Sequence, residues 1–427
     1  MQATIQIFHD GKWRTAGMFT PDAGSLKQGF AGSGVFDYDL DYAFDHATGA
    51  AAPAAALNYP VSFELHRGDR WPAFLLDIMP TGAGRRVWLR RLDLRDGPAA
   101  DWELLVQGAG NPPGNLRIAE AVIPCAGPHP GFTREEIVEK SADFIEYAEA
   151  RGAIVAGATD VQGDAPKFLL VRDRKRKWHP DGALEDRDVL DCWLVKFPRG
   201  KTEADRSVLR NEAPYLEVAR RFGILTGSPL QFSDDCLFIP RFDRLSGAAG
   251  LERHGMETLC SAAGISEFGK RGDHGTFCSV IARFSSDPRG DVIEYLRRDI
   301  LNAALRNTDN HSRNTAFLKP ADGSVTLSPL YDFAPMFLDP EGIPRSSRWA
   351  GELEPAVGRP AWGKIAEALA PFCDPKELRS QLARDAGAVQ RLPETMRECG
   401  VEDPVIERVA QRCAEVASDL LSAAPKE

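Results

Sequence analysis

Short alternating stretches of apolar and polar residues fill the first 125 positions of the chain. Apolar residues within 5–8 precede Asp10-Gly11, and a second such stretch, 13–19, follows. Because an Asp-Gly pair between apolar stretches is typical of a tight turn, this pattern predicts a β-hairpin. The same segment is rich in Gly, Pro and Ala, and it contains a strand-like run at 61–65 and a predicted helix at 84–92.

The middle of the chain opens with a helix signal. Thr133 and Glu136 have the spacing of a capping box, in which the hydroxyl accepts from the third amide and the glutamate reaches back. The predicted helix runs to about Ala150, because Gly152 should stop it.

Strands are predicted over most of 153–243. They are expected at 167–172, 192–197 and 236–239. One helical stretch, 204–221, interrupts them and should end at Gly223. Pro214 lies inside that stretch, so we expect it to start or kink the main part of the helix.

After about residue 250 the pattern becomes helical. Asp291 with Glu294 predicts a helix that ends near Leu305. Asp374-Pro375 and Asp403-Pro404 each open a further helix. The last helix carries one apolar stripe at helical spacing, which predicts a core face: Val405, Val409, Cys413, Val416 and Leu420.

These patterns divide the chain into three expected parts: an N-terminal subdomain (1–125), a β-rich lobe with one helix (126–250) and a helical lobe (251–427). A sheet lobe followed by a helical lobe is the order found in protein kinases. The expected fold class is therefore α+β, a two-lobed protein-kinase-like fold with a β-rich N-lobe, an all-helical C-lobe and an additional small N-terminal α/β subdomain.

Composition narrows the class of protein. The 427 residues are 43% apolar and 27% charged, which is typical of a soluble globular protein. The net charge of −10 argues against coating nucleic acid as the main task. The eight cysteines form no C-x-x-C pair, so a zinc cage is not expected. With no apparent signal peptide and no apolar run near the roughly 18–20 residues that cross a bilayer, we expect a cytoplasmic protein without membrane contact.

The segment 307–314 carries the most informative chemistry. Asp309 and Asn314 are five positions apart, the D-x-x-x-x-N spacing with which kinase loops place a base and a magnesium ligand. A predicted hairpin, 315–327, would bring Asp332 back beside Asn314, and a carboxylate with an amide oxygen suits Mg²⁺ on a nucleotide. Asp332-Phe333-Ala334 is a plausible counterpart of the kinase D-F-G metal aspartate. The alternative is a polar hairpin that only packs on the helical lobe.

Two upstream segments could contact phosphates. Lys196 lies in the apolar strand 193–197, where a lysine is costly unless paired, and Glu212 on the next helix is its candidate partner. An edge-strand lysine whose ammonium reaches water is the alternative. Small residues in 157–167 would let backbone amides approach phosphate oxygens, although the segment is neither a Walker A loop nor G-x-G-x-x-G. The basic run Arg172–Lys177 is interpreted as the solvated end of a hairpin, with a phosphate or nucleic-acid patch as the alternative.

Taken in order, these segments resemble the HipA family of serine/threonine kinase toxins from bacterial toxin–antitoxin systems. The likeness spans most of the chain, and its most specific part is 160–335. The matching motifs are 74–80, 103–105, 162–170, 194–198, 211–212, 239–244, 308–314 and 327–332.

The resemblance implies an ATP- and Mg²⁺-dependent serine/threonine protein kinase. It implies that Asp309 is the base, and that Asn314 and Asp332 are the metal ligands. It further implies a set of nucleotide-binding residues: Gln162, Gly163, Asp164, Ala165, Pro166, Lys167, Lys196, Glu212, Pro240, Arg241, Phe242, His311 and Tyr331. Within this set, the strand 240–242 would read adenine through its backbone.

Partners and regulation are also implied by the resemblance. The substrate would be a protein, such as glutamyl-tRNA synthetase or another translation component, with growth arrest as the outcome. The partner would be a small helix-turn-helix antitoxin, through which alone the chain would reach DNA. Relatives often carry an autophosphorylated serine in the Gly-rich loop; here Asp160, with Thr159 beside it, occupies about that position.

Two other functions remain open. One is a small-molecule kinase resembling aminoglycoside phosphotransferases, which use a similar Asp…Asn…Asp set. The other is a catalytically silent co-repressor that acts through an antitoxin on DNA. ATP turnover would separate the co-repressor from both kinases, and transfer to protein would separate the two kinases.

Overall fold

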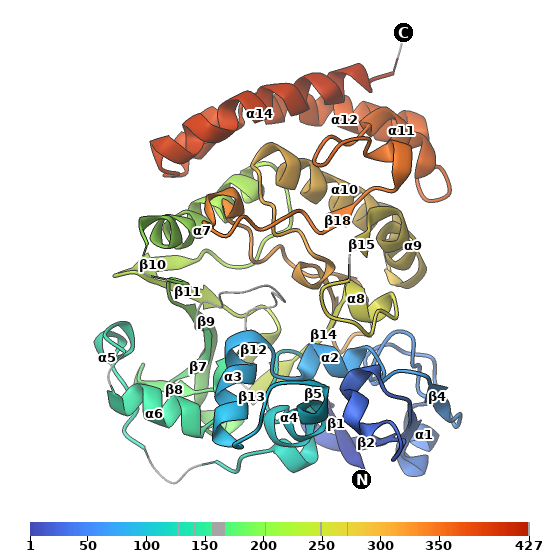
Figure 1. Ribbon diagram of the computed structural model, residues 1–427, viewed down its shortest axis with the longest axis vertical. Helices are drawn as coiled ribbons and strands as arrows, with labels where there is room; N and C mark the ends of the chain where they lie inside the picture. The colour runs from blue at the N-terminus through green and yellow to red at the C-terminus, as the bar shows by residue number, and fades with distance from the viewer. Residues whose placement is uncertain are drawn as a thin grey trace. The chain divides into compact units, whose positions relative to one another are not determined.

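The structure is a computed structural model that describes residues 1–125, 129–140, 142–155, 167–200, 202–247, 250–270 and 272–425 (Figure 1). The chain forms two compact units. The first comprises Met1–Arg199, Leu230–Gly269 and Phe317–Val325, and the second comprises Gly200–Pro229, Lys270–Ala316 and Thr326–Glu427. The division into three parts at 125 and 250 stays a prediction.

The N-terminal part of the first unit is built on a five-stranded antiparallel sheet in the order β4-β3-β2-β1-β5. Its strands are β1 (Ala3–His9), β2 (Lys12–Pro21), β3 (Gly34–Tyr38), β4 (His66–Gly68) and β5 (Leu116–Ile118). Asp10 and Gly11 have φ angles of 51° and 73°, as the tight turn of a hairpin requires, so the predicted hairpin is confirmed. The strand expected at 61–65 is wrong, because pairing begins only at His66 and two of the run's apolar side chains, Phe63 and Leu65, are exposed.

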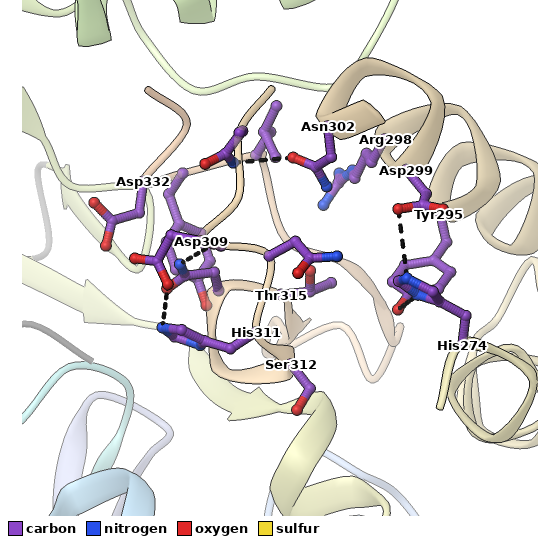
Figure 2. Close-up of a pocket in the computed structure, with 15 residues that line it drawn as sticks. His274, Tyr295, Arg298, Asp299, Asn302, Asp309, His311, Ser312, Thr315 and Asp332 are labelled. Atoms are coloured by element: carbon purple, nitrogen blue, oxygen red, sulfur yellow. Dashed lines mark hydrogen bonds and ion pairs between the residues drawn. The ribbon is translucent and has the colours of Figure 1, made fainter. Parts of the chain in front are cut away.

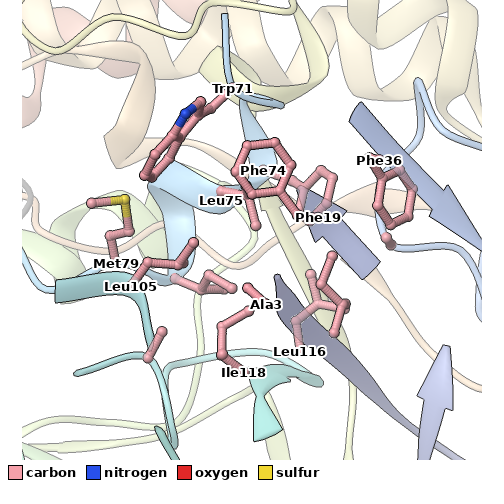
Figure 3. Packing of buried hydrophobic residues seen from close by; sticks show 14 of the residues in the cluster. Ala3, Phe19, Phe36, Trp71, Phe74, Leu75, Met79, Leu105, Leu116 and Ile118 are labelled. Atoms are coloured by element: carbon pink, nitrogen blue, oxygen red, sulfur yellow. The ribbon is translucent and has the colours of Figure 1, made fainter. Parts of the chain in front are cut away.

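Helices of the first unit pack on this sheet. They are α1 (Leu40–His46), α2 (Phe74–Ile78), α3 (Gly82–Arg91) and α4 (Asp101–Gly108), so the helix predicted at 84–92 is confirmed. Figure 3 shows Phe74 and Leu75 of α2 and Leu105 of α4 facing inward beside Phe19 of β2. These four side chains are at most 1% exposed, which marks them as one hydrophobic core.

A second sheet in the first unit has the order β10-β11-β9-β7-β6, with β8 also paired to β7. Its strands are β6 (Ile154–Val155), β7 (Lys167–Asp173), β8 (Trp178–Pro180), β9 (Val189–Lys196), β10 (Gln231–Ser233) and β11 (Cys236–Pro240). The three predicted strands are therefore confirmed as β7, β9 and β11. The basic run between β7 and β8 is confirmed as a hairpin end, because Arg174, Lys175 and Arg176 are exposed.

The helix predicted from Thr133 to Ala150 is two helices. The capping box is confirmed, since Glu136 N–H donates to Thr133 Oγ1 at 3.2 Å and Glu136 accepts from Thr133 N–H at 2.6 Å. However, α5 ends early (Arg134–Val138), because Lys140 takes a φ of 51° and breaks the helical path. The second helix is α6 (Ala142–Ala150), and Gly152 follows it with a φ of 67°.

The remaining elements of the first unit are short. They are β12 (Arg244–Gly247), β13 (Gly250–Arg253), β14 (Gly255–Thr258) and α8 (Leu259–Ala262). Two further strands, β16 (Ala316–Lys319) and β17 (Thr326–Leu327), lie where the chain passes between the two units.

The second unit is mainly helical. Its helices are α7 (Glu203–Arg221), α9 (His274–Phe284), α10 (Pro288–Ala304), α11 (Trp362–Ala368), α12 (Pro375–Gln390), α13 (Leu392–Glu398) and α14 (Asp403–Ser422), and β15 (Gly272–Asp273) pairs in parallel with β18 (Ser347–Arg348). The apolar stripe of α14 is at most 2% exposed, so its prediction as core is confirmed. Figure 1 shows α14 lying along α12, against which it packs.

The helix predicted at 204–221 is confirmed as α7, but one predicted cap and the expectation that Pro214 starts a helix need correction. The cap of α10 is Asp287, whose carboxylate accepts from the Gly290 amide at 3.0 Å, whereas Asp291 lies in the first turn. Asp291 instead accepts from Ser285 Oγ at 2.6 Å, which ties it to the preceding turn. Helix α7 begins at Glu203, so Pro214 lies inside a continuous helix and does not start it. No helix in the described ranges is long and apolar enough to span a bilayer.

Candidate active site

The candidate catalytic loop follows the C-terminal end of α10. Arg306 has a φ of 54°, a left-handed conformation that turns the chain away from the helix axis. The loop closes on itself because Asn314 Nδ2 donates to the Asp309 carbonyl at 3.0 Å. This bond joins the two ends of the loop, and both residues are 7% exposed.

The side-chain oxygen of Asn314 is not used in this hydrogen bond. Its Oδ1 is buried, and within the described ranges it accepts no hydrogen bond. A buried carbonyl oxygen without a donor is costly unless something outside the chain binds it. A hard cation such as Mg²⁺ prefers oxygen ligands of this kind, so the arrangement fits the expected metal role of Asn314.

The chain returns to this loop after residue 327, as the hairpin prediction required. Ser328 N–H donates to the Ala316 carbonyl at 2.8 Å, and Tyr331 Oη donates to the Arg313 carbonyl at 2.7 Å. Asp332 follows directly and lines the same pocket as Asp309 and Asn314 (Figure 2). The juxtaposition expected from the spacing is therefore present in the structure.

His311 lies next to the carboxylate of Asp309. Its Nε2 is 3.5 Å from Asp309 Oδ1, longer than a strong hydrogen bond. Figure 2 shows the imidazole below the carboxylate, at the edge of the pocket. The ring therefore limits where the carboxylate can turn, and it also lines the pocket.

Several pocket residues were not anticipated. Asn307 Nδ2 donates to Asn302 Oδ1 at 2.9 Å, and Arg298 donates to the Ser328 carbonyl at 2.8 Å. Arg298 also contacts Glu294 at 3.1 Å, so it joins α10 to the returning strand. The only available signal for these residues was their position in the turns of helix that lead into the loop.

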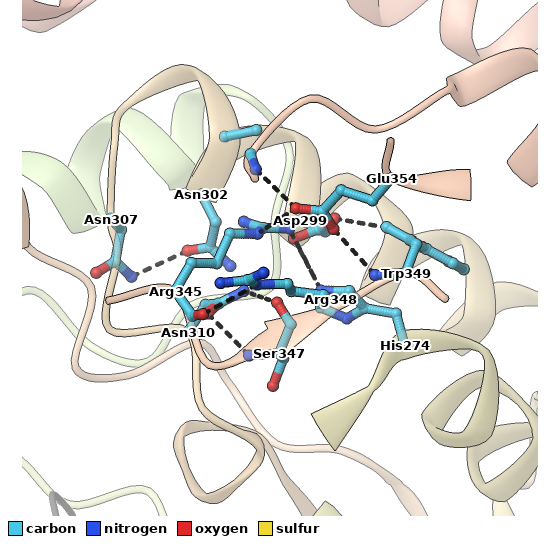
Figure 4. Close-up of polar contacts among 12 residues, drawn as sticks. His274, Asp299, Asn302, Asn307, Asn310, Arg345, Ser347, Arg348, Trp349 and Glu354 are labelled. Atoms are coloured by element: carbon cyan, nitrogen blue, oxygen red, sulfur yellow. Dashed lines mark hydrogen bonds and ion pairs between the residues drawn. The ribbon is translucent and has the colours of Figure 1, made fainter. Parts of the chain in front are cut away.

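A buried charged cluster supports the loop from behind (Figure 4). Arg345 donates to Asp299 Oδ1 at 2.5 Å, and Trp349 Nε1 donates to Asp299 Oδ2 at 2.9 Å. Burial acts to raise the pKa of Asp299, but Arg345 and His274 outweigh burial, so the pKa lies below its usual value. Burial lowers the pKa of His274, whose Nδ1 is 2.8 Å from Tyr295 Oη.

The first unit brings two of the predicted phosphate ligands together. Lys167 of β7 and Lys196 of β9 are direct cross-strand partners, so their side chains leave the sheet on the same face. Two neighbouring ammonium groups repel each other and attract an anion. The alternative of an edge-strand lysine is wrong, because β9 lies between β7 and β11 and Lys196 is 4% exposed.

The predicted adenine-reading strand lies at the end of β11. The Arg241 amide donates to the Cys192 carbonyl at 3.0 Å, which continues the β9–β11 ladder. In an antiparallel ladder alternate residues face opposite sides, so the backbone carbonyl of Pro240 points away from β9. Phe242 lies beyond the end of β11, in a bend. Strand β10 pairs with β11 only at 236–238, which leaves that side of Pro240 outside the sheet ladder.

The side chain of Arg241 has a structural role. It is buried, and it forms ion pairs with Asp181 and, at 2.6 Å, with Asp243. Burial alone would lower the pKa of Arg241, but the two carboxylates raise it above its usual value. Arg244 bonds to Asp243 at 3.0 Å and also donates to the Gly114 carbonyl, which fixes the strand end to the N-terminal part of this unit.

The remaining predicted site residues are Glu212 and the segment 162–166. Glu212 is buried on α7 in the second unit, whereas Lys196 belongs to the first unit. The segment 162–166, with Thr159 and Asp160, lies outside the described residues.

A family model and a named relative each match more than half of the chain. A family model described as the HipA-like C-terminal domain matches residues 159–417. The protein named Putative kinase Y4mE of Sinorhizobium fredii is 27% identical over 293 residues, which cover 65% of this chain and 67% of that protein.

Comparison with solved structures concerns the fold of the chain. HipA of Shewanella oneidensis, determined as a toxin–antitoxin complex with HipB and operator DNA, matches with a TM-score of 0.66 at 17% identity, over 98% of this chain and 96% of that one. The Helicobacter pylori proinflammatory kinase CtkA matches with a TM-score of 0.35 at 11% identity, over 62% of this chain and 91% of that one. The match to HipA confirms the expected α+β, kinase-like fold class.

Proposed function

Since the chain belongs to the family of the HipA-like C-terminal domain, we propose that it is a serine/threonine protein kinase of the HipA type. It would transfer the γ-phosphate of ATP to a protein hydroxyl. The observation that carries this proposal is the pocket in which Asp309, Asn314 and Asp332 meet, where no described residue donates to the buried Asn314 Oδ1.

Asp309 is the candidate base in this proposal. Its carboxylate would accept the proton of the attacking hydroxyl. The hydrogen bond from Asn314 Nδ2 to the backbone carbonyl of Asp309 keeps the loop closed. Catalysis of phosphoryl transfer depends mainly on such positioning and on charge stabilisation.

Asn314 Oδ1 and the Asp332 carboxylate would hold Mg²⁺. A magnesium ion bound there would neutralise charge on the phosphates and orient them. Asp332 has a φ of 54°, an uncommon conformation for a residue with a side chain. Strained backbone of this kind is typical of functional positions, and here it directs a carboxylate into the pocket.

The nucleotide would contact the first unit through phosphates and base. The pair Lys167 and Lys196 supplies positive charge for phosphate oxygens, and the amides of 162–166 would add donors. At the end of β11, the Pro240 carbonyl points away from β9 and would accept from the edge of adenine. The Phe242 amide would be the donor, as the resemblance implies. Glu212 would steady Lys196, as the resemblance implies.

A protein acceptor and an antitoxin partner complete the proposal. The Shewanella relative was solved with HipB and operator DNA, which supports a helix-turn-helix antitoxin as the partner of this chain as well. The acceptor would be glutamyl-tRNA synthetase or another translation component, and its phosphorylation would arrest growth. DNA would be reached through the antitoxin only.

A labelling experiment tests this function. The purified chain is incubated with γ-labelled ATP and Mg²⁺ in a whole-cell lysate, and labelled bands are identified together with the modified residue. We expect one dominant band labelled on serine or threonine. Label confined to small metabolites would support the aminoglycoside-type kinase, and no ATP turnover would support the silent co-repressor.

A further inference from the structure

A segment downstream of Asp332 is bonded directly to the catalytic loop. Asn310, the neighbour of Asp309, donates through Nδ2 to the Ser347 carbonyl at 2.9 Å. Its Oδ1 accepts from the Ser346 amide at 3.1 Å and from the Ser347 amide at 3.3 Å. One buried side chain, 8% exposed, thus uses both ends of its carboxamide on the backbone of 346–347 (Figure 4).

The same segment is fixed to α10 on its other side. Arg345 bonds to Asp299 of α10 at 2.5 Å, and its Nε is 3.4 Å from Glu354 Oε1. The Trp349 amide donates to Glu354 Oε2 at 2.9 Å, so Glu354 closes the segment into a loop around Arg345. Removing one member of such a buried ion set leaves the others without compensation, which is strongly unfavourable.

These contacts connect α10, the catalytic loop and the segment 345–349 in a closed network. Helix α10 leads into the catalytic loop, the loop holds 346–347 through Asn310, and Arg345 returns the segment to α10 through Asp299. Strand β15 adds a parallel pairing with β18 on the same segment. The residue that follows Asp309 is therefore held by a segment that is itself bonded to α10.

In many kinases the segment after the metal aspartate is ordered by phosphorylation, because a phosphate pairs with arginine. Here one arginine of the segment, Arg345, is already paired with carboxylates of the unmodified chain, those of Asp299 and Glu354. The second, Arg348, donates through Nε to the Arg345 carbonyl at 3.4 Å. Both carboxyl groups are at most 2% exposed, so solvent screens these pairs little.

We propose that Asn310 is a positioning residue, which together with Arg345 and Asp299 holds Asp309 in its working geometry without phosphorylation of the segment. This inference rests on the proposed kinase function. The catalytic loop is held by a carboxamide clamp, the hydrogen bonds of Asn310 to 346–347, and this clamp is held in turn by the buried ion pair of Arg345 and Asp299.

The test measures kcat and KM for ATP turnover by the full-length chain, with thermal denaturation alongside. In Asn310→Ala we expect kcat to fall at least tenfold while the KM for ATP stays within twofold, because within the described residues the hydrogen bonds of the Asn310 side chain go to the backbone of 346–347. Asn310→Asp keeps an acceptor for the two amides, so it should recover part of the rate. Arg345→Met should give the pattern of Asn310→Ala, and Arg345→Lys should lie between it and wild type.

A matched control is Asn115→Ala. Asn115 is also a buried asparagine, 3% exposed, and its Nδ2 donates to the Phe8 carbonyl at 3.3 Å in the first unit. It should keep the wild-type kcat. Phosphatase-treated wild-type protein should also keep its rate from the first turnover.

Each outcome decides between the claims. A wild-type kcat in Asn310→Ala, or equal losses in Asn310→Ala and Asn115→Ala, would overturn the positioning role. Loss of rate on phosphatase treatment would overturn the independence from phosphorylation. A wild-type chain that neither hydrolyses nor transfers from ATP would instead overturn the kinase function itself.

Discussion

Asp332 and Asp309 line one pocket, yet their backbone and partners give them different expected roles. Asp332 has a φ of 54°, whereas Asp309 lies in a loop closed by Asn314. Asp332→Ala should weaken the binding of Mg²⁺-ATP at least tenfold, because it removes one of two oxygen ligands for the cation. Isothermal titration with ATP, with and without Mg²⁺, measures this. An affinity unchanged in the presence of Mg²⁺ would contradict the metal role.

For Lys196 the sequence left two interpretations, a phosphate ligand and an edge-strand lysine, and the structure excludes the edge strand. Lys196 is buried on a central strand opposite Lys167, so its charge must be compensated within the fold or by a ligand. Lys196→Met should lower both ATP affinity and turnover, because a phosphate contact is lost. Lys364→Met, on a side chain that is 58% exposed, is the matched control and should change neither. Equal ATP affinity in both variants would exclude a phosphate role for Lys196.

At the scale of elements, α7 is tied to the start of α14 by Glu402. Its carboxylate accepts from Ser207 Oγ at 2.5 Å, Arg210 Nε at 2.7 Å and Asn211 Nδ2 at 2.8 Å. The Glu402 amide in turn donates to Asn211 Oδ1 at 3.0 Å. Helix α7 carries Glu212, so this junction also fixes the helix of a predicted site residue.

The Glu402 junction should make stability depend on pH. Burial acts to raise the pKa of Glu402, but the bonds from Ser207, Arg210 and Asn211 lower it below the usual glutamate value. A carboxyl with a depressed folded pKa stabilises the fold above its usual pKa and loses that contribution as pH falls. Glu402→Gln should cost about 1–2 kcal/mol at pH 7 and less at pH 4. Urea denaturation at both pH values measures this, and an equal cost at both would contradict the charge-based account.

Local signals in the sequence predicted several elements correctly. The Asp10-Gly11 turn, the capping box at Thr133 and the stripe of α14 each depend on neighbouring residues, so they could be read without tertiary information. The break at Lys140 could not, because no glycine or proline marks it and a left-handed lysine is uncommon. The cap of α10 was misassigned because Asp287 and Asp291 both stand near the helix start.

In the candidate site, too, only contacts between residues close in sequence could be predicted. The spacing of Asp309 and Asn314 and the return to Asp332 were predictable, because a short hairpin connects them. The supports of the loop were not, since Asn310 and Ser347 are 37 positions apart and Arg345 and Asp299 are 46 apart. Pairings at such separation are set by packing, which a single sequence without periodic signal does not reveal.

For the whole molecule, charge governs the expected behaviour toward DNA. The net charge of −10 opposes a polyanion, and Arg172, the first residue of the basic run, is engaged with Asp191 at 2.8 Å. The purified chain should therefore bind duplex DNA weakly and with little sequence preference. Fluorescence anisotropy at 150 mM salt measures this, and tight, selective binding by the chain alone would contradict it.

Regulation through the Gly-rich loop is a second expectation for the whole molecule. Asp160 carries one charge at about the position where the resemblance implies a serine, and a phosphate would carry nearly two. We expect Asp160 to damp activity little and Thr159 to be the hydroxyl available for modification. Intact mass after incubation with ATP tests this in wild type, Thr159→Ala and Asp160→Ser. Unmodified wild-type loop peptides together with a more than tenfold gain in Asp160→Ser would contradict it.

The most direct test of the central claim compares phosphoryl transfer with ATP binding in Asp309→Ala. If Asp309 is the base, the rate of transfer from γ-labelled ATP to protein should fall by at least two orders of magnitude, while ATP affinity stays within threefold of wild type. Asp45→Ala, at an exposed carboxylate of α1, serves as the control and should keep the wild-type rate. Transfer by Asp309→Ala at the rate of Asp45→Ala would show that this loop is not the catalytic centre of a kinase.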